Sequence, residues 1–291
     1  MRKPKTTKIP FTLQLLRLTY NTFGRLFPVY FGNRAYEQWF TTIKFNTPSY
    51  ELPALEAATK ESIKVNGLPV AVYIWQDKKT KPNASLLFIH GWNGRGTQVA
   101  NYIKKLNTIG YRVISFDGPA HGNTPGKQSS LLEMTDVVLA LNKSYGGFDA
   151  AITHSFGGMI LAFAMSQGLK LDRAALVCPP KDFQVIFDNF KRILALPDSV
   201  MQAVARKAFA THGQITQDLI NTINNVKRLS CKGLVIHDED DVDNPWRGGK
   251  EIADAWPGAT FIKTRGLGHR RIIHDDRVIE HIIDFMSDVA K

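Results

Sequence analysis

With 291 residues, 44% of them hydrophobic and 22% charged, the chain has the composition of a soluble globular protein that buries a full core. Its net charge of +11 and pI of about 9.6 suit an anionic partner such as nucleic acid, acidic lipid or an acidic substrate, although scattered lysines explain the charge more simply. The two cysteines, Cys178 and Cys231, lie far apart in apolar segments, which excludes a disulfide framework or zinc site and favours a reducing, cytoplasmic location.

The first forty residues are basic and then apolar and aromatic. Neither a signal peptide nor a transmembrane helix is expected, because polar residues, glycine and proline interrupt the apolar run and no small-residue cleavage site follows. An amphipathic helix fits the pattern instead, with apolar positions at Leu13, Leu15, Leu16, Leu18, Phe23, Leu26 and Phe27. We expect it to pack on the domain, and weak attachment to an anionic membrane stays open as the alternative.

From about residue 60, short apolar runs alternate with helical patterns. The runs predict strands at "VAVYIWQ" (70–76), "ASLLFIH" (84–90), "YRVISFD" (111–117), "DAAITHS" (149–155), "RAALVCPP" (173–180), "KGLVIHD" (232–238) and "ATFIKTRG" (259–266), before a last helix. Such alternation is typical of a doubly wound α/β fold with a mostly parallel sheet covered on both faces.

Residues 181–230 break this rhythm, because they contain no strand-like run and several amphipathic helical stretches. An all-helical insertion between two strands of a parallel sheet predicts a lid over the strands' carboxyl ends, where open α/β sheets bind ligands. We therefore expect a helical extension at 1–59, a core made of 60–180 and 231–291, and a lid at 181–230.

Polar residues follow the predicted strands at the points where those strands end. They lie in "HGWNGRG" (90–96), "FDGPAHGNTPG" (116–126), "THSFGG" (153–158), "HDEDDVDNP" (237–245) and "GLGHRR" (266–271). Because the carboxyl ends of parallel strands meet at one edge of the sheet, we expect these loops to converge there.

This set of motifs resembles the α/β-hydrolase superfamily, in its serine esterase and lipase branch with a helical lid, over most of the chain after residue 60. "THSFG" matches the family's nucleophile elbow G-x-S-x-G, in which a serine occupies a strained turn between a strand and a helix. Gly157 supplies the small residue that the turn needs two places after Ser155, whereas Thr153 stands where the family has glycine.

The resemblance implies a catalytic triad in the family's chain order of nucleophile, acid and base. Ser155 would be the nucleophile, Asp241 the acid after a strand, and His269 the base in "GLGH". Asp240 is the alternative acid, and the spacing to Pro245 favours Asp241.

An oxyanion hole is also implied by the resemblance, formed by the backbone N–H groups of Trp92 and Phe156. Gly91 would let the first of these turns approach the serine closely, and His90 would stabilise that turn. His154 is expected to point away from the site and to serve packing.

Other chemistries lack their motifs. There is no EF-hand loop, Walker A stretch, G-x-G-x-x-G or H-E-x-x-H, so neither a metal nor a cofactor is expected. A serine nucleophile argues against the haloalkane dehalogenase and epoxide hydrolase branches of the superfamily. Nucleic-acid binding is not expected, because the basic residues are dispersed and form no stripe with aromatic residues.

Apolar and basic residues alternate in the insertion at 181–230. This mixture suggests a small-molecule carboxylic ester with an apolar acyl or alcohol part, hydrolysed through an acyl-enzyme. Two alternatives stay open: an acyltransferase using the same three residues, and a non-catalytic binding or membrane-associated module that keeps the hydrolase fold. The oligomeric state and the natural substrate do not follow from the sequence.

Overall fold

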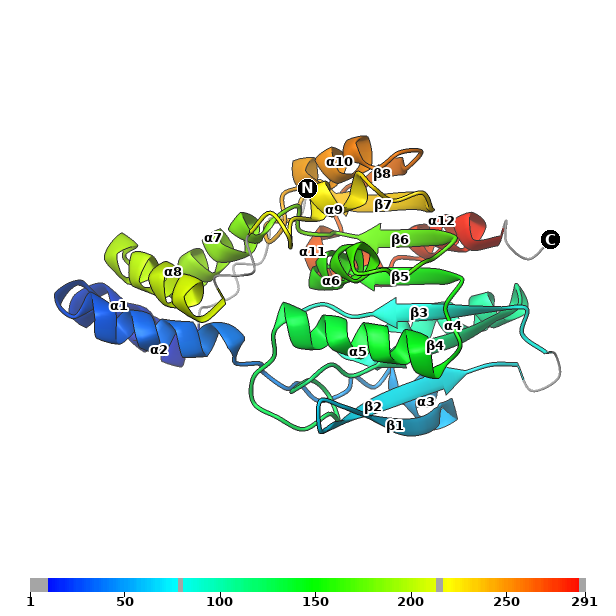
Figure 1. Ribbon diagram of the computed structural model, residues 1–291, viewed down its shortest axis with the longest axis horizontal. Helices are drawn as coiled ribbons and strands as arrows, with labels where there is room; N and C mark the ends of the chain where they lie inside the picture. Colours follow the sequence, from blue (N-terminus) through cyan, green and yellow to red (C-terminus); the bar gives the residue numbers. More distant parts are fainter. Residues whose placement is uncertain (1–9, 78–80, 213–216, 288–291) are drawn as a thin grey trace. The chain divides into compact units, whose positions relative to one another are not determined.

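The computed structural model describes residues 10–77, 81–212 and 217–287. The chain divides into two compact units, drawn in Figure 1. The smaller unit contains residues 1–41 and 184–216, and the larger unit contains residues 42–183 and 217–291.

An eight-stranded sheet forms the centre of the larger unit, in the order β1-β2-β4-β3-β5-β6-β7-β8. Its strands are β1 Thr59–Val65, β2 Leu68–Trp75, β3 Ala84–Ile89, β4 Tyr111–Phe116, β5 Ala150–His154, β6 Arg173–Val177, β7 Lys232–Asp238 and β8 Thr260–Thr264. The β1–β2 and β2–β4 pairs are antiparallel, and every other pair is parallel. The expected mostly parallel sheet is confirmed.

Helices cover both faces of this sheet (Figure 1). The long ones are α4 Ala100–Thr108, α5 Leu131–Ser144, α6 Phe156–Ser166, α10 Trp246–Ala255 and α12 Asp276–Ser287. Short helices lie at α3 Leu52–Ala57, η1 Gly96–Val99, α9 Thr222–Val226, α11 Gly268–Arg271 and η2 Ile272–His274. Helices α4 and α12 share one apolar core with the strands, while α5 and α6 pack together in front of the sheet.

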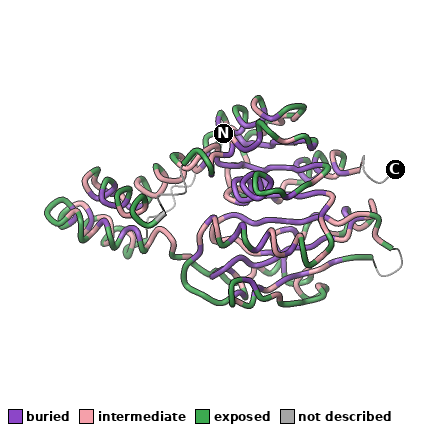
Figure 2. Tube along the Cα trace, viewed as in Figure 1, coloured by how far each residue is buried: buried purple, intermediate pink, exposed green. Residues whose placement is uncertain are grey.

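Every residue of β5 and β6 is buried, as the purple central strands of Figure 2 show. Burial on both faces explains why these strands read as continuous apolar runs rather than as an alternation. The loop that carries Ser155 therefore leaves from a strand that is covered on both faces.

The smaller unit consists of the helices α1 Phe11–Leu26, α2 Pro28–Phe40, α7 Phe183–Leu194 and α8 Asp198–His212. The first residue of α7, Phe183, is the last residue of the larger unit's first segment. Its core includes Tyr20 and Tyr36 from the first two helices and Leu194 and Val200 from the insertion. Gly32 lets α2 and α8 cross closely, because a Cβ at this position would collide with Ala203.

This division differs from the expected one. The N-terminal helices and the insertion were predicted as separate parts, yet they form one unit, while residues 42–59 and 217–230 belong to the sheet unit. Each amphipathic helix has an apolar face, and four helices bury those faces against one another. The lid role of the insertion stays a prediction. In the described part of the chain no helix is both long and apolar enough to cross a bilayer.

Candidate active site

Three of the predicted side chains meet in the larger unit. His269 Nε2 lies 2.8 Å from Ser155 Oγ, and His269 Nδ1 lies 2.7 Å from Asp241 Oδ2. An ionised carboxylate only accepts hydrogen bonds, so Nδ1 carries the hydrogen and Nε2 is left to accept from the serine hydroxyl. Although the residues are far apart in the sequence, the loops after β5, β7 and β8 bring them into one hydrogen-bonded row.

Ser155 occupies a strained turn between β5 and α6. Its backbone has φ 54° and ψ −124°, a region that residues with a Cβ rarely adopt. Its N–H donates to the carbonyl of Val177 on the neighbouring strand at 2.8 Å. The sharp turn presents the hydroxyl at the carboxyl end of the sheet, where the other loops gather.

Small residues make this turn possible. A Cβ at Gly157 would collide with the carbonyl of Ile89, and a Cβ at Gly91 would lie 2.9 Å from the Cβ of Ser155. Thr153 replaces the usual glycine on a fully buried strand position, and in the described part of the chain its Oγ1 has no hydrogen-bond partner. Gly158, the next residue of α6, is also closely packed, because a Cβ there would lie 2.8 Å from the Cβ of Pro179.

Asp241 is completely buried and accepts hydrogen bonds on both oxygens. Oδ1 receives the backbone N–H groups of Asp243 and Asn244 at 2.9 and 2.8 Å, and Oδ2 faces His269. Burial alone would raise the pKa of Asp241, but hydrogen bonds from His237, His269 and the Asn244 N–H outweigh it and hold the pKa well below its usual range. The site thus keeps a buried anion beside the imidazole.

His237, at the end of β7, approaches the same carboxylate from the other side. Its Nε2–H is shared between two acceptors, the carbonyl of Asn244 at 2.7 Å and Asp241 Oδ2 at 3.3 Å. Helix α10 packs directly on its ring, since a Cβ at Gly249 would collide with His237 Nδ1. Asp241 therefore lies between two histidines, an arrangement that the sequence analysis did not predict.

Asp240, the alternative acid, lies away from the imidazole. It is exposed, and its Oδ2 accepts the N–H of Gly266 at 3.0 Å. Asp238 contributes more than Asp240 to holding this loop, because its carboxylate accepts the N–H groups of Leu267 and Gly268 at 3.2 and 2.8 Å. Asp238 thus fixes the loop that carries His269, and only its position at the end of a strand hinted at this.

His154 does not point away from the site, contrary to expectation. Its Nε2 donates to the backbone carbonyl of His269 at 2.8 Å, and the two rings lie 5.2 Å apart. Burial, followed by the nearby His269, lowers the pKa of His154 to about 3. A neutral buried imidazole therefore supports the backbone of the neighbouring histidine.

His90 connects two of the site loops. Its Nε2 accepts the N–H of Gly118 at 3.0 Å, so its Nδ1 carries the hydrogen that bonds the Gly91 carbonyl at 2.7 Å. Burial lowers the pKa of His90 to about 4 and that of the adjacent His121 to about 3. The His90 contacts agree with the turn-stabilising part expected for it.

Trp92 and Phe156 come from the two turns that flank Ser155. Their rings meet edge to face with centroids 5.7 Å apart, and both residues are half-buried. Phe156 is the first residue of α6, so its N–H has no acceptor within the helix and lies at the positive end of the helix dipole. The two turns predicted to form the oxyanion hole thus lie next to each other.

Among the described residues, the donor atoms of Cys178, His237 and Asp241 lie within 4.8 Å of one another. Burial raises the pKa of the Cys178 thiol, and the His237 nitrogen that faces Asp241 already donates to a carbonyl. A protonated thiol and an occupied imidazole nitrogen do not fit a metal ion. The cluster is better explained as the packing that holds Asp241.

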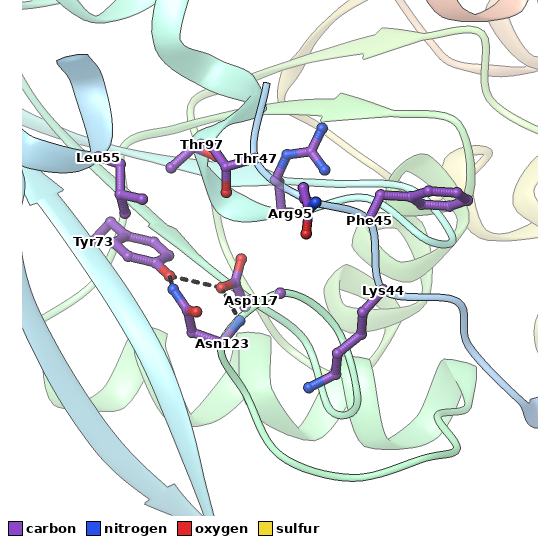
Figure 3. A pocket seen from close by; sticks show the side chains of 11 residues that line it. Lys44, Phe45, Thr47, Leu55, Tyr73, Arg95, Thr97, Asp117 and Asn123 are labelled. Atoms are coloured by element: carbon purple, nitrogen blue, oxygen red, sulfur yellow. Dashed lines mark hydrogen bonds between the residues drawn. The ribbon is translucent and has the colours of Figure 1, made fainter. Parts of the chain in front are cut away.

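A polar cavity of about 240 Å³ lies beside the loop at 116–126, without contact to Ser155, Asp241 or His269 (Figure 3). At its wall Asp117 accepts the hydroxyl of Tyr73 and the N–H groups of Gly96 and Asn123, each at 2.7 Å. These hydrogen bonds connect the turn after β3 with the loop after β4. Asp117 therefore stabilises two of the loops that surround the active site.

Several known proteins are similar to this chain. Among solved structures, Est1E from Butyrivibrio proteoclasticus with ferulic acid bound is 17% identical, with a TM-score of 0.62, over 79% of this chain and all of its own (100%). Mouse alpha/beta hydrolase domain-containing protein 10 is 16% identical, with a TM-score of 0.63, over 80% and 98% of the two chains. A bromoperoxidase from Bacillus anthracis is 16% identical, with a TM-score of 0.59, over 79% and 100%. At these identities the likeness shows the fold alone.

No curated protein has a sequence that matches this chain. A family model described as the alpha/beta hydrolase family matches residues 86–281, from the third strand to the last helix. The match covers more than half of the chain and includes all the loops that carry the hydrogen-bonded row. This chain therefore belongs to the α/β-hydrolase family.

Proposed function

We propose that the protein is a serine hydrolase that cleaves a carboxylic ester through an acyl-enzyme. The observation that supports this most is the row from Ser155 through His269 to Asp241, with both hydrogen bonds shorter than 3 Å. A serine hydroxyl is a weak nucleophile unless a base accepts its proton, and the base needs an acid to orient it. The three groups have this relation before any substrate binds.

In the proposed reaction, Ser155 Oγ attacks the ester carbonyl carbon while His269 Nε2 takes its proton. The charge on the carbonyl oxygen would be stabilised by the backbone N–H groups of Trp92 and Phe156. When the tetrahedral intermediate collapses, the ester C–O bond breaks and the leaving alcohol takes the proton from His269. Water then repeats these steps on the acyl-enzyme and releases the acid.

The half-buried rings of Trp92 and Phe156 support an ester with an apolar acyl or alcohol part, since they give the surroundings of Ser155 an apolar wall. A panel of chromogenic esters of rising chain length would measure this preference. Product analysis with an added alcohol separates hydrolysis from acyl transfer, because both begin from the same acyl-enzyme.

Labelling with a fluorophosphonate tests the nucleophile without knowledge of the natural substrate. We expect the wild-type protein to be labelled and Ser155→Ala to be unlabelled, because the probe reacts only with an activated serine. Ser166→Ala serves as the matched control, since that residue lies at the far end of α6. An unlabelled wild-type protein that is folded by circular dichroism would overturn the proposal.

A further inference from the structure

Helix α1 has apolar side chains on two opposite faces. Its inner face packs against the core of the smaller unit through Tyr20, with Leu13 and Leu16 half-buried beside it. Gly24 allows the close approach to α8, because a Cβ at this position would lie 3.0 Å from Val200. Packing within the unit therefore accounts for one face of the helix and leaves the other unexplained.

The second face is an apolar stripe in solvent. Positions 11, 15, 18, 22 and 26 follow one another at helical spacing and so lie along one side of α1. Phe11, Leu15, Leu18 and Leu26 are 77%, 54%, 63% and 69% exposed, and the only polar member is Thr22. Phe27, Val29 and Tyr30, which follow α1 in the sequence, are exposed apolar residues as well.

Positive charge is concentrated in the same unit. Residues 1–41 and 184–216 contain eleven lysines and arginines against three acidic residues, a net +8 of the chain's +11. The larger unit, with about three times as many residues, carries only +3. Four of the basic residues, Arg2, Lys3, Lys5 and Lys8, directly precede α1 in the sequence.

We propose that the outer stripe of α1 docks the protein on an anionic lipid surface. An amphipathic helix that lies in a membrane interface needs an exposed apolar face and nearby cationic residues, and this unit supplies both. A second copy of the chain fits less well, because two units of charge +8 would repel each other. This proposal does not depend on the catalytic role of Ser155.

Vesicle sedimentation with the full chain tests the proposal. Phosphatidylcholine vesicles with and without phosphatidylserine are compared at low and high salt. We expect binding to the anionic vesicles only, lost at high salt, and weakened about tenfold or more by Leu15→Asn with Leu18→Asn. Ile43→Asn with Leu219→Asn is the matched control, since these side chains are 58% and 49% exposed in the larger unit.

Two further measurements test whether the stripe instead binds a second copy of the chain or packs against another part of the same chain. Light scattering after size exclusion would overturn the proposal if the wild type formed a dimer that the stripe variant lacked. Thermal unfolding would overturn it if the stripe variant lost stability comparable to a core substitution, because the stripe would then be packed within the chain. Absent or salt-independent binding to the anionic vesicles would also overturn it. Turnover of a soluble ester should be unchanged in the stripe variant.

Discussion

At the residue scale, the central group is the buried carboxylate of Asp241. It receives two backbone N–H groups on one oxygen and faces His269 and His237 with the other. These donors hold its pKa low despite burial, which favours the ionised form. An ionised acid at this place stabilises the imidazolium that forms when His269 takes the serine proton.

His237 should act as a positioning residue for Asp241. His237→Phe removes one donor from the carboxylate, so burial raises the pKa of Asp241 and its ionised form is lost at a higher pH. We expect kcat to fall about tenfold and the acid limb of the kcat profile to move toward neutral pH. Both are measured on a chromogenic ester from pH 4 to pH 9.

His237→Gln keeps a side-chain N–H and should recover part of the lost rate. A purely structural role would lower the yield of folded protein without moving the pH profile. An unchanged profile in folded His237→Phe protein would therefore contradict this role.

The sequence predicts the reacting groups better than the residues around them. Ser155, Asp241 and His269 could be found because each occupies a motif position in the family's order. The spacing could not exclude Asp240, since neighbouring side chains differ in direction only once the backbone is known. The contacts that His237 and Asp238 make with the site could not be predicted, because as the last two residues of an apolar strand they look like an ordinary strand end.

At the element scale, the serine turn depends on the close approach of α6 to the end of β3. Gly157, the second residue of α6, lies against the carbonyls of Ile89 and His90. Because those carbonyls lie at the carboxyl end of β3, a central strand of the sheet, neither partner can move aside without disturbing the turn that holds Ser155.

Gly157→Ala should therefore cost both stability and reactivity. The added methyl group would force the helix start away from β3, and overpacking of this kind costs roughly 1–3 kcal/mol. Urea unfolding measures the stability loss, and the rate of fluorophosphonate labelling should fall by about tenfold or more because the hydroxyl is displaced. Normal labelling of the variant would contradict this account of the turn.

Gly146→Ala is a useful comparison for this prediction. Gly146 has φ +78°, but a Cβ there would meet nothing within 4 Å. The substitution should cost only the backbone strain, about 1 kcal/mol, and leave the labelling rate unchanged.

The sequence predicts a helix or strand correctly where the local residue pattern determines it. It fails where the element depends on residues far away in the chain. The strand β1 was not predicted, because most of its residues are exposed and it shows too little apolar character at the sheet edge. The helices of the smaller unit were expected as helices, but their shared core joins residues 20 and 36 to residues 194 and 200. No periodicity within either segment reveals that pairing.

At the scale of the whole molecule, three buried histidines couple the fold to pH. His90, His121 and His154 are buried beneath the site loops, and burial is the first cause that lowers the pKa of each. His90 and His121 also face each other with ring centroids 4.9 Å apart, which disfavours charge on both. The folded protein therefore keeps these imidazoles neutral at pH values where an unfolded chain protonates them.

This coupling predicts acid destabilisation that begins near pH 6.5, the ordinary pKa of histidine. The folded pKa values are about 4 for His90 and about 3 for His121 and His154, so between pH 6.5 and pH 4 the unfolded state binds more protons. Stability is then fully present above pH 6.5 and falls as the pH drops, by roughly 1 kcal/mol per pH unit for each histidine. Urea unfolding at pH 7, 6 and 5 measures the slope.

His121→Gln removes one of these groups and should reduce the slope by roughly 1 kcal/mol per pH unit, whatever its effect on stability at pH 7. The slope is the decisive quantity, because a lost packing contact shifts the unfolding free energy equally at every pH. His281→Gln, on the exposed side of α12, provides the matched control and should leave the slope as in the wild type. A wild-type unfolding free energy that does not change between pH 7 and pH 5 would contradict neutral histidines beneath the site loops.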